Sequence, residues 1–302
     1  MPQRCHRFGG SRLDRDIFQS TMTPGSGLVT RFPSVSATRY VQPLREGGSL
    51  PAVVDTDGGL FVVKFRGAGQ GAKALVAELL VGQIAEALDL PVPELALVHV
   101  PPPFGRGEPD PEIQDLLQQS HGMNVGLRYL DGAFNFDARA AGEFITPDLA
   151  TRIVWLDAFV TNPDRTHRNP NLLIWQRTPW LIDHGAALYA HHDWESVDAE
   201  RIRTPFPLIR DHVLLAASGD LAAFDATAAT RLTRGVLGDM VAAVPGELLA
   251  AADATIAPDA SRERYVNYLI GRLAAPRRFV AEAVEARERA RREPPRPLGA
   301  RR

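Results

Sequence analysis

The sequence predicts an α+β protein with a strand-rich first part and a helical last part. Short apolar runs bounded by glycine, proline and aspartate recur between residues 38 and 130, and such runs indicate strands. From Pro205 onward, apolar residues recur at helical spacing instead. At 302 residues, the chain is long enough for one unit of two lobes or for two modest domains.

The composition is ordinary for a soluble globular protein, with 45% hydrophobic and 23% charged residues. The net charge of −2 excludes an overall basic field that would attract nucleic acid or an anionic membrane. The single cysteine, Cys5, excludes an internal disulfide and a thiolate zinc site. No signal-peptide core or long apolar run is present. We therefore expect a cytoplasmic protein without a membrane or nucleic-acid partner.

Residues 1–33 are rich in Arg, Gly, Ser and Thr and have no periodic pattern, so we expect a flexible extension. Strands are predicted over 38–44 and 51–54, joined by a tight turn. The turn contains Gly47, Gly48 and Ser49. Its glycines would let backbone N–H groups approach a phosphate, with the serine hydroxyl as a further donor. A plain hairpin turn is the alternative.

A third strand, residues 60–65, carries Lys64 between two apolar residues. A lone buried ammonium is costly, so Lys64 either faces water or points inward to a phosphate. Residues 73–88 have helical spacing, and Glu78 lies one turn into that helix. A strand lysine fixed by a helix glutamate holds the α- and β-phosphates in kinases. The alternative for Glu78 is a solvated helix face.

The rest of the chain divides near residue 131. A strand over 94–100, a proline-rich surface loop and a strand over 124–130 complete the first lobe. We expect this lobe to span residues 34–130 and the second lobe to span 131–293. The tail, residues 294–302, is rich in proline and arginine and is expected to be disordered.

The second lobe begins with a well-marked helix. Thr146 is a capping residue, followed by proline in the first turn and an early acid. Asp157 lies on or beside the apolar face of this helix, where it either holds the following loop or is a satisfied polar residue. Further helices are predicted over residues 208–217, 226–244, 247–252, 261–274 and 277–292.

The stretch after this helix, residues 161–183, has the spacing of a phosphoryl-transfer site. Asp164 lies in a loop, where its carboxylate could accept the proton of an attacking hydroxyl. Asn169 and Asp183 offer oxygens that suit Mg²⁺. A hairpin of residues 172–175 and 180–182 separates them, turned by residues 176–179. The alternative is that all three residues only shape turns.

Together these parts resemble the HipA-like kinases, in particular a stand-alone bacterial branch with a PLREGGSLP loop, here residues 43–51. The Asp-Arg and Asp-His-Gly segments also resemble, more distantly, phosphatidylinositol 3/4-kinases. The resemblance covers roughly residues 36–285. The resemblance depends on the PLREGGSLP loop, Val63 to Gly67, Glu78, Asn162 to Arg165, Asn169 to Asn171 and Ile182 to Gly185.

The resemblance implies a two-lobed protein-kinase-like fold, with a small antiparallel sheet and one helix in the N-lobe and a mainly helical C-lobe. It also implies transfer of the γ-phosphate of ATP, with Mg²⁺, to a hydroxyl acceptor. The expected acceptor is Ser or Thr of a protein, and the chain itself is a candidate. A lipid or small-molecule kinase and a nucleotide-binding pseudokinase adaptor are the alternatives.

The resemblance also assigns roles to individual residues. It makes Lys64 the phosphate lysine, Glu78 its partner, Asp164 the catalytic base, Asn169 and Asp183 the metal ligands, and Gly47, Gly48 and Ser49 the phosphate loop. One position departs from the pattern, because Thr166 stands where the relatives usually have histidine. No role is carried over to His167, the next residue.

Overall fold

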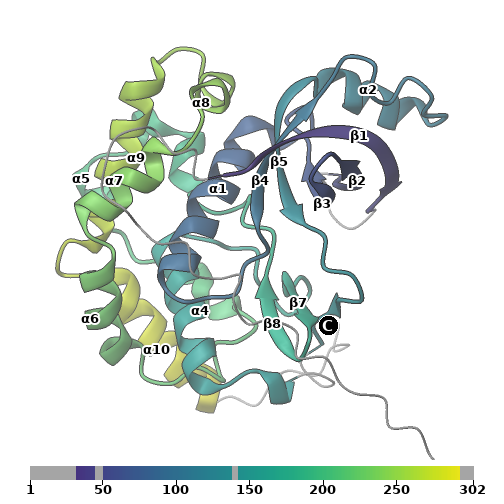
Figure 1. Cartoon of the computed structure of the whole chain (residues 1–302). Helices are drawn as coiled ribbons and strands as arrows, with labels where there is room; N and C mark the ends of the chain where they lie inside the picture. The colour runs from purple at the N-terminus through teal and green to yellow at the C-terminus, as the bar shows by residue number, and fades with distance from the viewer. Residues whose placement is uncertain (1–31, 45–49, 138–141, 293–302) are drawn as a thin grey trace, which may run out of the picture. The chain divides into compact units, whose positions relative to one another are not determined.

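The computed structural model describes residues 32–44, 50–137 and 142–292 (Figure 1). The predicted phosphate loop, the C-terminal tail and nearly all of the N-terminal extension lie outside these residues. The first part of the described chain contains β1 (Ser34–Pro43), β2 (Ala52–Thr56), β3 (Gly59–Lys64), α1 (Gly71–Ala87), β4 (Leu95–Val100), α2 (Pro111–Gln119) and β5 (Gly122–Arg128).

The five strands form a closed barrel in the order β1-β2-β3-β5-β4. Four of the pairs are antiparallel, but β1 and β4 are parallel, with Ser34 to Ser36 opposite Leu97 to His99. The prediction of a small antiparallel sheet is therefore wrong for the pair β1 and β4, which closes the barrel. Two irregularities in the register of β1 with β2 bend the ten-residue strand, which lets its first residues close the barrel against β4.

The first part of the chain contains a second helix, α2, whereas only one helix was predicted there. The Asp110 side chain accepts a hydrogen bond from the Glu112 N–H at 3.0 Å, and Pro111 occupies the first turn. Its apolar residues Ile113, Leu116 and Leu117 join the core of the barrel. The cap, proline and acid repeat the signal that was recognised at Thr146, so the helix could have been predicted.

The second part of the described chain is mainly helical, as predicted. Its principal helices are α4 (Pro147–Phe159), α5 (Ala199–Ile202), α6 (Leu221–Arg231), α7 (Arg234–Ala242), α8 (Gly246–Ala252), α9 (Pro258–Leu273) and α10 (Arg278–Arg292). Thr146 caps α4 by accepting the Leu149 N–H at 3.1 Å. The predicted helix over 226–244 is two helices, because Thr233 caps a new one at the Val236 N–H.

The helix predicted over 208–217 is wrong. A 3₁₀ helix, η4 (Pro207–Asp211), occupies the start of this segment, and turns follow it. His212 is extended, with φ −67° and ψ 129°, and forms an isolated β-bridge with Thr166. Val213 then donates its N–H to the Arg165 carbonyl at 3.1 Å. These contacts with a distant loop override the helical spacing of the segment.

A three-stranded sheet of β6 (Phe134–Asn135), β7 (Leu172–Trp175) and β8 (Thr178–Leu181) lies in the second part of the chain. The β7–β8 turn has two residues, Gln176 and Arg177, in place of the predicted four. Both have positive φ, 49° and 63°, as a tight hairpin turn requires. Pro179 is tolerated in β8 because this is an edge strand.

The helix α1 is covered on all sides. Thirteen of its 17 residues are buried. It packs against β5 on the barrel side and against α7 and α8 on the helical side (Figure 1). The Gln83 side chain donates to the Met240 carbonyl of α7 at 3.1 Å, which fixes this second contact.

Among the described helices, none alone is long and apolar enough to cross a bilayer. Helices α7 and α8 meet that test only when taken together, and they are bent by 86° at the break between them.

Candidate active site

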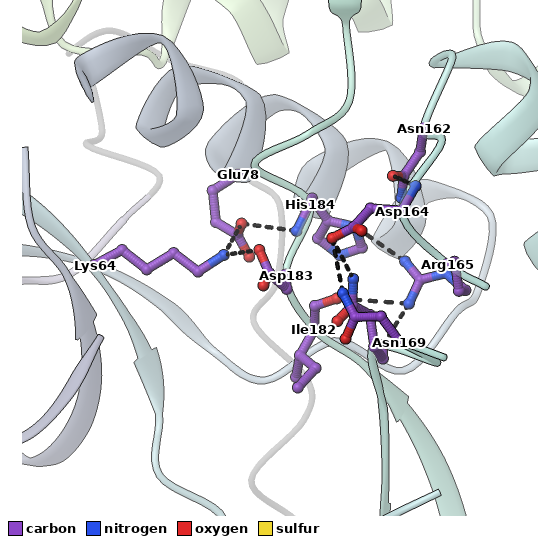
Figure 2. Close-up of polar contacts among 10 residues, drawn as sticks. Lys64, Glu78, Asn162, Asp164, Arg165, Asn169, Ile182, Asp183 and His184 are labelled. Carbon is purple, nitrogen blue, oxygen red and sulfur yellow. Dashed lines mark hydrogen bonds and ion pairs between the residues drawn. The ribbon is translucent and has the colours of Figure 1, made fainter. Parts of the chain in front are cut away.

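Lys64, Glu78 and Asp183 meet between the barrel and the β7–β8 hairpin (Figure 2). The Lys64 ammonium lies 2.6 Å from Glu78 Oε2 and 2.6 Å from Asp183 Oδ1. Lys64 is the last residue of β3, Glu78 is in the second turn of α1, and Asp183 follows β8. The structure therefore rejects the surface alternative for Lys64 and the solvated alternative for Glu78.

Burial and charged neighbours together decide the charges of Lys64 and Asp183. Burial disfavours the Lys64 ammonium, but the Glu78 and Asp183 carboxylates outweigh this and raise the pKa of Lys64 above its usual value. Burial also disfavours the Asp183 carboxylate, but Lys64 prevails and lowers the pKa of Asp183. Lys64 is therefore held as a cation and Asp183 as an anion at neutral pH.

The backbone at Asp183 is shaped to bring this carboxylate to the lysine. Asp183 has φ 57°, a left-handed conformation that is uncommon outside glycine. The next N–H, that of His184, donates to Glu78 Oε2 at 2.8 Å. Glu78 Oε2 thus accepts from both Lys64 and the chain beside Asp183. A single buried oxygen of α1 ties the end of β3 to the segment after β8.

Asp164 lies in a loop after α4, and neighbouring amides orient it. Its Oδ2 accepts from Asn169 Nδ2 at 2.9 Å and from Asn171 Nδ2 at 3.2 Å. Its N–H donates to Asn162 Oδ1 at 3.1 Å. Within the described residues, Oδ1 of Asp164 accepts no hydrogen bond. One carboxylate oxygen is therefore fixed, and the other is available to a ligand.

The contacts of Asp157 show that it holds the loop after α4, which was one of the two alternatives predicted for it. It accepts from Asn162 Nδ2 at 3.0 Å, from Arg165 Nε at 2.6 Å and from His212 Nε2 at 2.9 Å. Burial opposes its charge, but the charge of Arg165 and the bond from His212 prevail and lower its pKa. Sequence reasoning missed Arg165 and His212, since no local pattern shows that a charged residue is buried.

The structure thus forms two adjacent groups from the predicted site residues. Lys64, Glu78 and Asp183 form one, and Asp164 with Asn169 forms the other. Arg165 follows Asp164 in the chain, and its Nη2 lies 3.4 Å from Nδ1 of His184, the residue after Asp183 (Figure 2). The remaining predicted residues, Gly47, Gly48 and Ser49, lie outside the described part of the chain.

Buried His184 has no charge at neutral pH. Burial and the Arg165 guanidinium lower its pKa to about 3. As a neutral ring, it can accept the Arg165 N–H at Nδ1, and the proton is then on Nε2. That nitrogen is buried and has no partner among the described residues.

Comparison with known proteins identifies one family. The sequence model of one family, described as HipA-like kinase, matches residues 41–205, which is more than half of the chain. No curated protein matches the chain significantly. A crystal structure of a Helicobacter pylori proinflammatory kinase, CtkA, matches with a TM-score of 0.49 and 12% identity over 85% of this chain and 99% of that one.

The matched residues include Lys64, Glu78, Asp164, Asn169 and Asp183, and all five lie in the two groups described above. The chain belongs to the HipA-like kinase family and is a phosphotransferase.

Proposed function

We propose that this kinase has two lobes, divided near residue 131, and transfers the γ-phosphate of Mg-ATP to a hydroxyl, most simply to Ser or Thr of a protein. The observation that carries the proposal is the position of Lys64. Its ammonium is shared by two carboxylates from distant segments, one fully buried and one with a side chain 34% exposed. A buried partner fixes the lysine, and an exposed partner leaves it accessible to phosphate.

Lys64 acts by holding phosphate oxygens, and Glu78 acts by holding Lys64. The Glu78 side chain is fully buried, so it is not available to a nucleotide and serves to position the ammonium. Charge-assisted hydrogen bonds from a lysine fixed in this way orient phosphate more firmly than a mobile side chain can. In this proposal, residues 47–49 supply further donors to the phosphates.

Asp164 acts as the base. Its Oδ2 is occupied by two amide donors, whereas Oδ1 is available to the hydroxyl of the acceptor. A carboxylate fixed on one side accepts the proton on the other as the hydroxyl attacks. Both Asn169 and Asn171 orient the base, so the loop delivers it in one conformation.

The residues present fit a magnesium ion. Asp183 offers a carboxylate oxygen, Oδ2, that accepts no hydrogen bond within the described residues. Asn169 donates through Nδ2 to Asp164, which leaves its Oδ1 as a further oxygen ligand. Magnesium prefers hard oxygen ligands and takes few from protein when phosphates supply the rest. When bound, it neutralises charge that develops on the phosphate oxygens.

The alternative acceptors are a lipid and a small metabolite, and a pseudokinase adaptor would transfer nothing. Incubation with γ-labelled ATP and Mg²⁺, followed by separate measurement of protein, lipid and metabolite fractions, distinguishes them. We expect label in protein, and intact-mass analysis shows whether the chain itself gains a phosphate. Label only in lipid or metabolite would show that the acceptor is not a protein. Nucleotide binding without transfer in any fraction would favour the adaptor.

A further inference from the structure

Three buried residues beside the site have no part in binding or proton transfer as described so far. They are Asp157 in α4, Arg165 next to the proposed base, and His212 from the segment after η4. The side chains of Asp157 and Arg165 are fully buried, and that of His212 is 2% exposed. A buried ion pair of this kind is costly to form, so its contribution to stability alone does not account for its contacts.

Both oxygens of the Asp157 carboxylate accept hydrogen bonds. Oδ1 accepts from Asn162, and Oδ2 accepts from both Arg165 and His212. The Asn162 N–H also bonds to the Asp157 carbonyl at 2.8 Å. Because α4 is packed in the core, these bonds give the following loop a fixed point of attachment.

Arg165 uses its other nitrogens on the segments that carry the two proposed functional carboxylates. Nη1 donates to the Asn171 carbonyl and lies 3.5 Å from the Ile182 carbonyl. Asn171 is one of the two amides that hold Asp164, and Ile182 precedes Asp183. Nη2 reaches His184, which follows Asp183. One planar guanidinium therefore contacts the chain on both sides of Asp183 and the support of Asp164 (Figure 2).

His212 fixes the remaining side of Asp157. The Leu214 N–H donates to its Nδ1 at 3.0 Å, so the proton of the neutral ring lies on Nε2 and points to Asp157. The backbone of the same segment bridges Thr166 and bonds to the Arg165 carbonyl. His212 thus holds both the orienting carboxylate and the backbone of the loop.

We propose that Arg165, oriented by Asp157 and His212, is a positioning residue that keeps Asp164 and Asp183 in fixed relation to each other. The inference goes beyond the proposed function and rests on it. A guanidinium suits this task because its donors lie in one rigid plane and can satisfy several acceptors at once. A lysine at the same place keeps the charge but cannot contact Asp157, Asn171 and His184 together.

A matched pair of substitutions at His212 tests the proposal. His212→Gln retains a donor at the place of Nε2, whereas His212→Asn retains an atom only at the place of Nδ1. Both variants are neutral and each loses one hydrogen bond, so we expect both to fold, with a similar loss of stability. Urea unfolding measures this loss and sets a temperature at which both are folded.

Two measurements separate positioning from stability. The first is the rate of ADP release at saturating Mg-ATP. The second is the affinity for a non-hydrolysable ATP analogue with and without Mg²⁺, by calorimetry. We expect His212→Asn to lower the rate about 10- to 100-fold and to reduce the gain in affinity that Mg²⁺ gives, because small displacements of reacting groups cost that much. We expect His212→Gln to remain within about threefold of the wild type.

Arg165→Lys is the second test and should reproduce the effects of His212→Asn. The proposal is overturned if folded His212→Asn and Arg165→Lys keep the wild-type rate and magnesium dependence, or if His212→Gln falls as far as His212→Asn. If either the asparagine or the lysine variant does not fold, the other decides. A wild-type protein that neither binds the analogue nor releases ADP would instead refute the proposed function itself.

Discussion

The Lys64 ammonium lies 2.6 Å from Asp183, a residue 119 positions away in the sequence, and equally close to Glu78. The two carboxylates differ in environment, since the Glu78 side chain is fully buried and that of Asp183 is 34% exposed. In the proposed function, Lys64 turns from Asp183 toward a phosphate while it keeps its contact with Glu78. Asp183 would then be free to bind a cation.

Replacing Glu78 with glutamine should weaken nucleotide binding and transfer together. The variant leaves the Lys64 ammonium buried without its fixed counter-charge. The ammonium then either stays on Asp183 or leaves its position in the site. We expect a fall of about 10- to 100-fold in kcat/KM for ATP, measured by ADP release. Glu86→Gln, an exposed glutamate of the same helix, is the control and should match the wild type. Equal kinetics in both variants would remove Glu78 from the site.

Asp164→Asn should bind ATP normally and fail to transfer phosphate. An amide cannot take the proton of the acceptor hydroxyl, and loss of a general base lowers rates by about 10²- to 10⁴-fold. Calorimetry with the analogue measures binding, and labelled ATP measures transfer. Unaltered turnover would show that Asp164 is not the base. Asp259→Asn, whose carboxylate is 96% exposed on α9, controls for the loss of one charge.

Asp183→Asn should act through magnesium. The variant keeps an oxygen but loses the charge that attracts the ion, so about tenfold more Mg²⁺ should be needed for half-maximal analogue binding. The affinity for the analogue without Mg²⁺ should not fall, because the variant removes a negative charge that repels the phosphates. A magnesium titration at fixed analogue concentration measures both. A variant with wild-type magnesium dependence would exclude Asp183 as a ligand.

Stability should fall as the pH drops from 7 to 5, in part because of His191. Burial, with His192 and Lys73 nearby, lowers the pKa of His191 to about 3, and its Nδ1 lies 3.1 Å from the Tyr265 hydroxyl. The unfolded chain binds the proton below about pH 6.5 and the folded chain does not, so acid favours unfolding. One such histidine contributes about 2 kcal/mol over this range.

His191→Asn tests this contribution, because asparagine keeps a partner for Tyr265 and does not titrate. Its free energy of unfolding, from urea curves at pH 7 and pH 5, should fall about 2 kcal/mol less than that of the wild type. Parallel profiles for the variant and the wild type would show that His191 binds its proton equally in the folded and the unfolded chain.

Spacing in the sequence, with the family resemblance, was enough to predict which polar side chains lie together. Lys64 and Glu78 stand on a strand and the next helix, and Asp164, Asn169 and Asp183 flank a hairpin, so local geometry limits where each can lie. Arg165 and His212 could not be predicted in this way. Their partnership with Asp157 depends on packing between segments far apart in the chain, and an arginine in a loop ordinarily faces water.

Two of the errors in the fold have the same physical origin. The parallel pairing of β1 with β4 joins strands that are distant in sequence, and residues 208–217 have helical spacing but extend at His212 to bridge Thr166. The two-residue turn at Gln176 and Arg177 lacks the glycine or asparagine that usually marks positive φ. By contrast, α2 carried a local cap and could have been found.

The enclosure of α1 restricts how this enzyme could be controlled. Moving the helix outward to separate Glu78 from Lys64 would strip apolar contacts from the barrel and from α7 and α8 at once, and would break the bond from Gln83 to Met240. Such a motion would cost more than a single ligand or modification usually supplies. An inhibitor or regulator would therefore act more readily on the more exposed side of the site, at Asp183 or at the loop that carries Asp164, than on this helix.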